Sequence, residues 1–189
     1  MAAALALLDR DGRAALTMRA VARELDVEGA SLYTHVRSKD DLVDGVLDLV
    51  LEEVVLPPTG TAWRAALVDG FTAYRSTLLD HPAVVPLVTE RAHRSRAQAR
   101  LVERSIVLLE QAGLSTRDAV QAHVTLIAFT IGFVVQEVGR PVRPPSADEE
   151  VGPVLERAVA ALAQVPVDDR FRSGLETVIL GAVDRPRGQ

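Results

Sequence analysis

The side chains best suited to chemistry in this sequence lie in residues 29–35, which read GASLYTH. The polar members carry hydroxyl, phenol or imidazole groups, which form hydrogen bonds without a full charge: Ser31, Tyr33, Thr34 and His35. The two leading residues, Gly29 and Ala30, are small and allow a close approach of the backbone. Such a surface suits DNA base edges, which offer donors, acceptors and thymine methyl groups in the major groove.

Two short helices joined by a tight turn would present this segment. Thr17 is a suitable N-cap for a helix over Met18–Leu25, and a third helix is expected over Ala30–Val36, with Gly29 in the turn between them. The apolar residues expected to hold the two helices together are Val21, Ala22, Leu25, Val27, Leu32 and Val36. This arrangement is a helix-turn-helix, whose second helix lies in a DNA major groove.

A few basic side chains lie close to this segment, although the N-terminal part of the chain is acidic overall. Arg19, Arg37 and Lys39 flank it at points where they could meet phosphates. Residues 1–56 hold 6 basic and 11 acidic residues, whereas residues 57–189 hold 15 of each. The totals therefore exclude a globally basic nucleic-acid binder, and any DNA contact must come from a local patch.

The rest of the sequence also has helical periodicity. Ser38, with Asp41 three residues later, begins a fourth helix that Pro57 and Pro58 end. Further helices are expected over residues 61–80, 83–91, 96–112, 115–138, 153–164 and 168–183. The sequence thus predicts an all-α fold of about nine to ten helices.

The run from Leu32 to Leu42, LYTHVRSKDDL, resembles the signature that closes the DNA-binding domain of the tetracycline-repressor (TetR) family. The preceding LTMRAVARELDV, residues 16–27, fits the same pattern. The resemblance implies a three-helix DNA-binding domain over residues 1–45 and a helical effector-binding and dimerisation domain over 46–189. It also implies a homodimer that represses transcription and leaves operator DNA when a small ligand binds. The lack of a membrane-length apolar run and of a basic leader predicts a cytoplasmic protein. By this resemblance the DNA-contact positions are Thr17, Arg19, Gly29, Ala30, Ser31, Tyr33, Thr34, His35 and Lys39.

Two features depart from that family pattern. Gly29 and Ala30 stand where relatives often carry larger or polar base readers, which leaves only backbone approach or a thymine methyl contact there. No basic arm precedes the first helix, so either the true start lies upstream or phosphate anchoring is weak.

Two helices are expected to form a dimer interface. The helix Ser115–Val138 is apolar nearly all round, and Ala128 and Gly132 would permit close approach of another helix. The helix Asp168–Val183 carries a second apolar face, so the two would pair with their symmetry mates in a four-helix bundle. The alternative is that both are ordinary core helices of a single chain.

A ligand cavity is expected between the helix over 61–80 and the helix over 115–138. Its expected lining is apolar with a few polar groups: Phe71, Tyr74, Leu78, His123, Ile127, Thr130 and Phe133. Each of these residues could instead be plain core. A basic cluster runs from Arg91 through His93, Arg94, Arg96 and Arg100 to Arg104, and is either a solvated face paired with Glu90, Glu103 and Glu110 or a site for anions.

The sequence gives little support for other functions. No cysteine and no catalytic motif is present, and the four histidines are scattered, so we expect no enzyme, metal site or cofactor. The longest apolar run, 124–135, is interrupted by Thr125, Thr130 and Gly132, which argues against a membrane span. A helical, dimeric small-molecule-binding protein without DNA-binding activity remains the alternative function.

Overall fold

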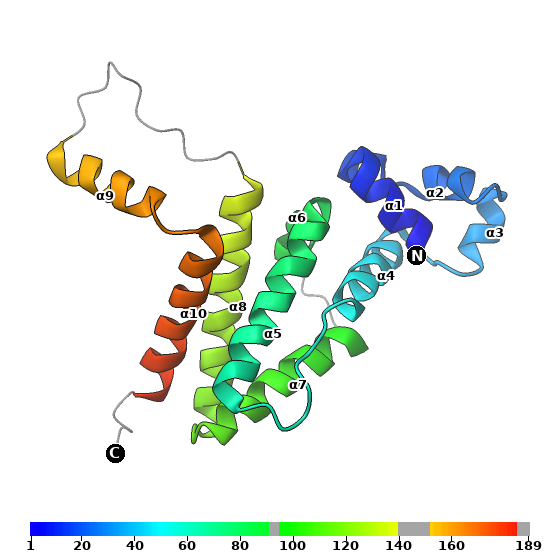
Figure 1. Ribbon diagram of the computed structural model, residues 1–189. Coiled ribbons are helices and arrows are strands. Elements are labelled where there is room, and N and C mark those ends of the chain that lie inside the picture. The colour runs from blue at the N-terminus through cyan, green and yellow to red at the C-terminus, as the bar shows by residue number, and fades with distance from the viewer. Residues whose placement is uncertain (91–94, 140–151, 185–189) are drawn as a thin grey trace.

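The computed structural model describes residues 1–90, 95–139 and 152–184. Within these ranges the chain forms helices and no strand, which confirms the all-α prediction (Figure 1). The α-helices are α1 (Ala2–Asp11), α2 (Met18–Glu24), α3 (Gly29–Tyr33), α4 (Lys39–Glu52), α5 (Trp63–Asp80), α6 (Val85–Glu90), α7 (Arg96–Gln111), α8 (Thr116–Val138), α9 (Pro153–Ala163) and α10 (Val167–Val183). Short 3-10 turns lie at Arg13–Ala15 and Pro82–Val84.

Helices α1 to α3 and the first half of α4 form the unit that we call the head. Two predicted caps begin its helices: the Thr17 hydroxyl accepts a hydrogen bond from Ala20 N at 3.1 Å, and Ser38 Oγ accepts one from Asp41 N at 3.1 Å. Each such cap stabilises a helix by about 1 kcal/mol. The core of the head is aliphatic and includes Leu5, Leu8, Leu16, Val21, Leu32, Val36, Leu42 and Val46.

The turn between α2 and α3 differs from the sequence prediction in two ways. Leu25 and Val27 are 48% and 40% exposed, so they do not hold the two helices together as expected. Burial of Val21, Ala22, Leu32 and Val36 does this instead. The residue with a left-handed backbone is Asp26, with φ of 53°, which aspartate tolerates better than most side chains. Gly29 is therefore free to begin α3 rather than to form the turn.

Helix α4 connects the head to the rest of the molecule. Leu42, Val46 and Val50 pack in the core of the head. Leu51, one residue further on, packs with Tyr74 and Leu78 of α5 in a second core. One continuous helix thus shares its side chains between two packed regions, and a shift of one end is transmitted to the other.

Helices α5, α7, α8 and α10 form a bundle on the other side of α4 (Figure 1). Phe171 of α10 packs on Phe129 and Phe133 of α8, with ring centroids 5.6 and 5.2 Å away. Gly174 leaves room for the Phe129 ring, because a Cβ at that position would overlap it. Helices α8 and α10 are thereby held in close contact.

A buried arginine adds polar contacts to this bundle. Arg75 Nε of α5 donates to Glu137 Oε2 of α8 at 2.7 Å, and its Nη1 donates to Asp168 Oδ1 of α10 at 2.8 Å. Its guanidinium also lies 4.9 Å from the centroid of the Phe171 ring. One cation therefore ties three helices together, and the hydrogen bond to Glu137 raises the Arg75 pKa above its ordinary value in spite of burial.

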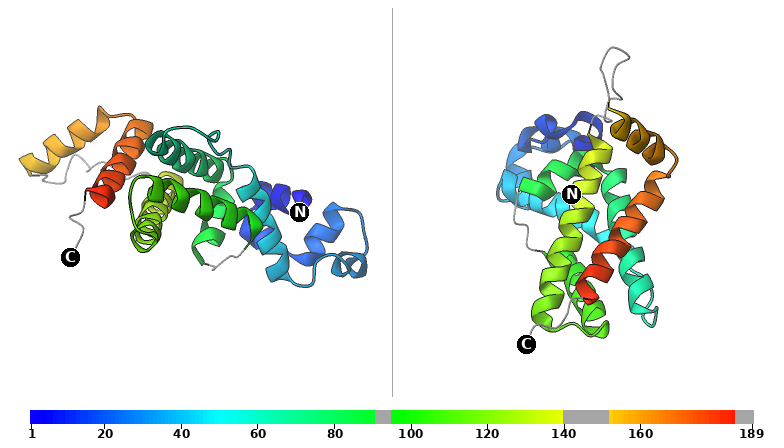
Figure 2. Two further views of the ribbon diagram at one scale, coloured as in Figure 1. Left: turned by 90° about the horizontal axis from the view of Figure 1, so that it is seen from below. Right: turned by 90° about the vertical axis from the view of Figure 1, so that its left-hand side faces the viewer.

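An apolar stripe runs along the outer side of α8. Val120, Val124, Val135 and Val138 are each 41% to 56% exposed, and Leu180 of α10 is 40% exposed. Helix α9 extends away from the bundle in all three views and has no buried residue (Figures 1 and 2). Helix α8 is long and apolar enough to cross a membrane by length and composition alone, a test that core helices of soluble proteins also meet.

Candidate functional sites

Helix α3 lies at the edge of the molecule furthest from α8 and α10 (Figures 1 and 2). Leu32 and Val36 turn inward, at 6% and 4% exposure, while Tyr33 between them is 56% exposed. All nine residues expected to contact DNA are exposed. The sequence pattern thus separated the packed face of α3 from its free face.

Local hydrogen bonds hold this surface in place. Thr34 Oγ1 donates to Ser31 O at 2.6 Å, and the backbone N–H of Arg37 donates to Asp41 Oδ2 at 2.9 Å. Asp41 thus fixes the turn that leads from α3 into α4. Lys39 is the first residue of α4, and its side chain is exposed beside that turn.

Acidic side chains of the head have basic partners, and Glu24 is one example. Arg10 of α1 bonds Glu24 of α2 through both Nη atoms, at 3.0 and 3.1 Å, and these hydrogen bonds lower the pKa of Glu24. The pair joins α1 to α2 and offsets the Glu24 charge. The acidic composition of the head therefore does not leave every carboxylate unopposed, and the local charge pattern matters more than the total.

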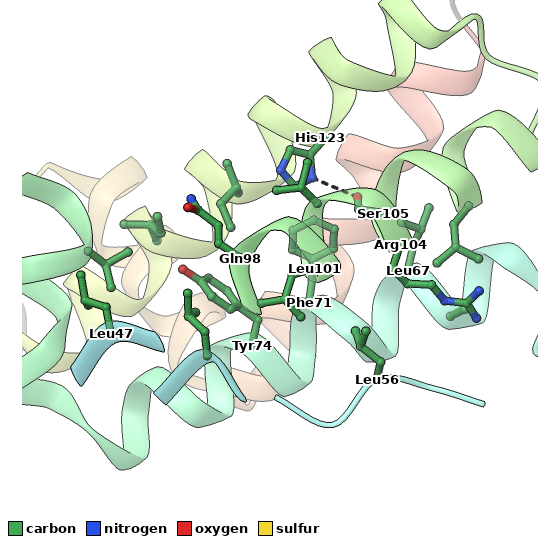
Figure 3. A pocket seen from close by; sticks show the side chains of 18 residues that line it. Leu47, Leu56, Leu67, Phe71, Tyr74, Gln98, Leu101, Arg104, Ser105 and His123 are labelled. Carbon is green, nitrogen blue, oxygen red and sulfur yellow. Dashed lines mark hydrogen bonds between the residues drawn. The ribbon is translucent and has the colours of Figure 1, made fainter. Parts of the chain in front are cut away.

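The second site is a cavity of about 300 Å³ among α4, α5, α7 and α8 (Figure 3). Leu47 and Leu51 of α4 form one wall, and Leu67 and Phe71 of α5 form another. Most other lining residues are aliphatic. A cavity of this size and character, with a few polar groups, suits a small molecule.

The polar groups of the cavity centre on His123 of α8. Its Nδ1 lies 3.0 Å from Ser105 Oγ of α7, and its ring centroid lies 6.3 Å from that of Phe71. Burial lowers the pKa of His123, so the ring is neutral at pH 7. Burial raises the pKa of Tyr74 to about 12, so its phenol is neutral as well.

The cavity contains only part of the residue set expected from sequence. Phe71, Tyr74, His123 and Ile127 line it, but Leu78, Thr130 and Phe133 do not. Leu78 is fully buried in the core beside Val54 and Val85. Thr130 is also fully buried, and its hydroxyl donates to Leu126 O of its own helix at 2.8 Å. Phe133 turns toward Phe171 and Arg75.

Sequence reasoning missed the wall that α7 contributes. Six α7 residues line the cavity: Gln98, Leu101, Val102, Arg104, Ser105 and Leu108. A signal was present, because Leu101, Ser105 and Leu108 have the i, i+4, i+7 spacing of one helix face. A small polar residue within an apolar stripe indicates a buried hydrogen bond, and Ser105 makes one to His123.

Only part of the expected basic cluster lies within the residues that the structure describes. Arg91, His93 and Arg94 lie outside the described residues. Arg100 and Arg104 point toward carbonyl groups, with Nη2 at 3.5 Å from Leu51 O and 3.4 Å from Pro58 O. They brace the end of α4 and the segment after it. Among the expected acidic partners, Glu90 bonds Arg13 of the head and Glu110 accepts from Thr116.

No group of three or more His, Cys, Asp or Glu side chains that could hold a metal ion occurs in residues 1–90, 95–139 and 152–184.

Two family models match the chain. Residues 1–46 match the model for bacterial regulatory proteins of the tetR family, and residues 56–184 match the tetracyclin repressor-like C-terminal domain. The two matches together span the head and the bundle. The chain belongs to the TetR family. TetR-family proteins are soluble, dimeric transcriptional regulators and not enzymes.

Sequence comparisons with individual proteins agree with the family assignment. The chain is 36% identical to an HTH-type transcriptional regulator of Saccharopolyspora erythraea over 72% of its own length, but spans only 58% of that relative. It is 30% identical to the class D tetracycline repressor protein of Escherichia coli, covering 95% of this chain and 85% of the relative.

Solved structures show the same fold. ActR of Streptomyces coelicolor in complex with actinorhodin has a TM-score of 0.80 at 28% identity, covering 96% of this chain and 93% of that one. BioQ of Mycobacterium smegmatis has a TM-score of 0.78 at 32% identity, covering 98% and 96%. BioQ has also been solved with its double-stranded DNA operator.

Proposed function

We propose that this TetR-family chain is a ligand-responsive repressor of the cytoplasm. As a homodimer it binds operator DNA through α3 of each subunit, and a small molecule in the cavity releases it. Residues 1–45 supply the DNA-binding domain, and residues 46–189 supply the effector cavity and the dimer interface.

The observation that carries this proposal is the double role of α4. Leu47 and Leu51 form a wall of the cavity, while Leu42, Val46 and Val50 of the same helix pack in the core of the head. A molecule that displaces the cavity wall therefore also displaces the head, because a well-packed helix moves as a rigid body.

Release from DNA then follows from the spacing of the two DNA-binding helices in a symmetric dimer. The two α3 helices of a dimer bind half-sites roughly 34–36 Å apart, about one turn of DNA. A shift of α4 changes that separation. For a near-complete switch the ligand must favour the released state by about 5.5 kcal/mol.

Within the reading surface, the residues divide into two roles. Tyr33 and His35 read bases, because both are exposed and can form hydrogen bonds: Tyr33 ends α3, and His35 lies in the turn that follows it. Arg19 and Lys39 contact phosphates at the two sides of that face, which sets register without reading sequence. Ser31 and Thr34 complete the polar surface.

The dimer forms through α8 and α10. Their exposed valines and Leu180 supply apolar surface for the contact, and the exposed Ala128 and Gly132 let a partner helix approach closely. This also accounts for the apolar length of α8, which a partner subunit rather than a lipid bilayer would cover.

Two relatives lend weight to both halves of the proposal. BioQ has been crystallised with operator DNA, and ActR with actinorhodin. A protein of this fold can therefore hold DNA, and another can hold a small molecule.

The test is a mobility-shift titration of the full chain with the DNA upstream of its own gene and with a scrambled duplex of equal length. We expect specific binding with Kd of about 10⁻⁸ M or tighter at physiological salt, and binding to the scrambled duplex at least about 10³-fold weaker. Equal affinity for the two duplexes, or no binding to either, would instead favour the dimeric ligand-binding protein without DNA activity.

A further inference from the structure

The lining of the cavity is asymmetric in charge. Of the 18 lining residues, none is aspartate or glutamate. Five are polar and can donate hydrogen bonds: Tyr74, Gln98, Arg104, Ser105 and His123. A cationic ligand would lose its hydration without gaining a counter-charge, whereas an acceptor oxygen would find donors.

The contact between Ser105 and His123 favours one of the two neutral tautomers of the ring. Four threonine hydroxyls in these helices donate to the carbonyl four residues earlier: those of Thr72, Thr125, Thr130 and Thr177. The Ser105 hydroxyl makes no such bond to any described residue, and its hydrogen-bond partner is His123 Nδ1 at 3.0 Å. A buried hydroxyl donates its proton where it can.

It follows that Nδ1 of the neutral ring accepts and that Nε2 carries the hydrogen. Nε2 makes no hydrogen bond to any residue that the structure describes. His123 lines the cavity, so this N–H is a donor available to whatever fills the space (Figure 3).

The body of the ligand must be apolar. Phe71 lies beside the His123 ring, and Leu67, Leu101 and Ile127 add aliphatic surface. A volume of about 300 Å³ is at the lower end of the range for ligand cavities, which suits a molecule of two or three fused rings.

We infer that the effector is a non-cationic ring compound with a carbonyl oxygen, such as an aryl ketone or a quinone. Nε2–H of His123 donates to that oxygen, and Ser105 is the positioning residue that fixes the donor tautomer. This inference rests on the proposed function, since it specifies the ligand of the same cavity.

Three probes of similar shape separate the alternatives: naphthoquinone, naphthalene and the N-methylquinolinium cation. The chain has no cysteine that a quinone could alkylate. Calorimetric titration of the full-length protein should show naphthoquinone binding roughly ten-fold tighter than naphthalene, because naphthalene leaves a buried N–H unpaired. The cation should bind at least about ten-fold more weakly than naphthalene.

Variants test whether His123 and Ser105 cause the preference for naphthoquinone over naphthalene. In His123→Phe, the affinities for naphthoquinone and naphthalene should differ by no more than about two-fold. Ser105→Ala should reduce the preference for naphthoquinone without weakening the binding of naphthalene. Thr72→Val is the matched control, because this half-buried α5 hydroxyl bonds only its own helix, to Val68 O, and does not line the cavity. Thermal unfolding of each variant reports whether it folds.

Four outcomes would overturn the inference: equal affinity of the wild-type protein for naphthoquinone and naphthalene, tightest binding of the cation, no binding of any probe, or an unchanged preference in His123→Phe. Loss of the preference in Thr72→Val would also overturn it, because the effect would then come from general packing. The upstream DNA titration is independent of these probes, so a failure of the ligand class and a failure of the repressor function remain distinguishable.

Discussion

Nδ1 of His81 lies 2.7 Å from Oδ2 of Asp9, and this contact joins the end of α5 to α1 in the head. The other ring nitrogen, Nε2, lies 3.0 Å from Oε2 of Glu53 at the end of α4. Only the doubly protonated imidazolium can donate to both carboxylates at once. A protonated His81 therefore links the head, α4 and α5 at the junction through which the cavity must act.

This contact predicts a pH dependence of stability. Burial alone would lower the pKa of His81, but its hydrogen bonds to Asp9 and Glu53 outweigh burial and raise it. A raised pKa in the folded state stabilises the fold fully below the ordinary value of 6.5, and this stabilisation is lost as the pH rises through the folded-state pKa. Urea unfolding at pH 6 and pH 8.5 should show a larger loss of stability for the wild-type protein than for His81→Gln. Parallel losses in both proteins would contradict the prediction.

The buried Arg75 predicts that two ion pairs of α5, one buried and one exposed, contribute unequally to stability. Arg75→Ala leaves Glu137 without its partner in a mostly buried place, and should reduce the free energy of unfolding by about 3 kcal/mol or more. The matched control is Asp69→Ala, which breaks the exposed pair with Arg172 at 3.6 Å and should change stability by less than about 1 kcal/mol. Chemical denaturation measures both. Similar losses for the two variants would show that Arg75 is not the central tie of the bundle.

The apolar stripe of α8 predicts that one charge separates the subunits. Val124 is 56% exposed in the single chain, so Val124→Glu should leave the monomer folded but weaken the dimer by about 2 kcal/mol or more. Sedimentation velocity over a range of concentrations measures this, with circular dichroism as a check on folding. Val55→Glu changes a valine that is 79% exposed after α4, away from the stripe, and should leave the dimer intact. If Val124→Glu sedimented as the wild-type protein does, α8 would not form the interface.

The extent to which sequence predicted this molecule depended on how local each signal is. Thr17 and Ser38 were placed correctly because a cap depends on a few adjacent residues, and each accepts the expected backbone hydrogen bond. Leu25 and Val27 were misassigned because an apolar residue in a short turn does not show which side faces the core.

The cavity was harder to predict because its walls come from four helices. Phe71 and His123 were found, since both lie on faces of α5 and α8 that a cavity between those helices requires. Thr130 and Phe133 lie within three turns of His123 on the same helix, yet face the core and α10. Which side of α8 receives α7 and which receives α10 depends on tertiary packing, and periodicity in one helix does not contain that information.

Lys39 predicts a change in affinity without a change in specificity. If its ammonium contacts a phosphate as proposed, Lys39→Ala should weaken binding to upstream and scrambled DNA by similar factors, and should flatten the slope of log K against log salt by about one unit. Fluorescence anisotropy at several salt concentrations gives both quantities. If the ratio of the two affinities collapsed while the slope stayed the same, Lys39 would be a base reader instead.

The most direct measurement of the central claim, that the free face of α3 reads DNA, is the ratio of affinities for upstream and scrambled duplexes in Tyr33→Ala. Tyr33 is 56% exposed and its removal disturbs no core, so the variant should fold and dimerise as the wild-type protein does. We expect its affinity for upstream DNA to fall by about 1 to 3 kcal/mol while binding to the scrambled duplex hardly changes. A wild-type ratio in Tyr33→Ala would contradict the account, because specificity would then come from another surface.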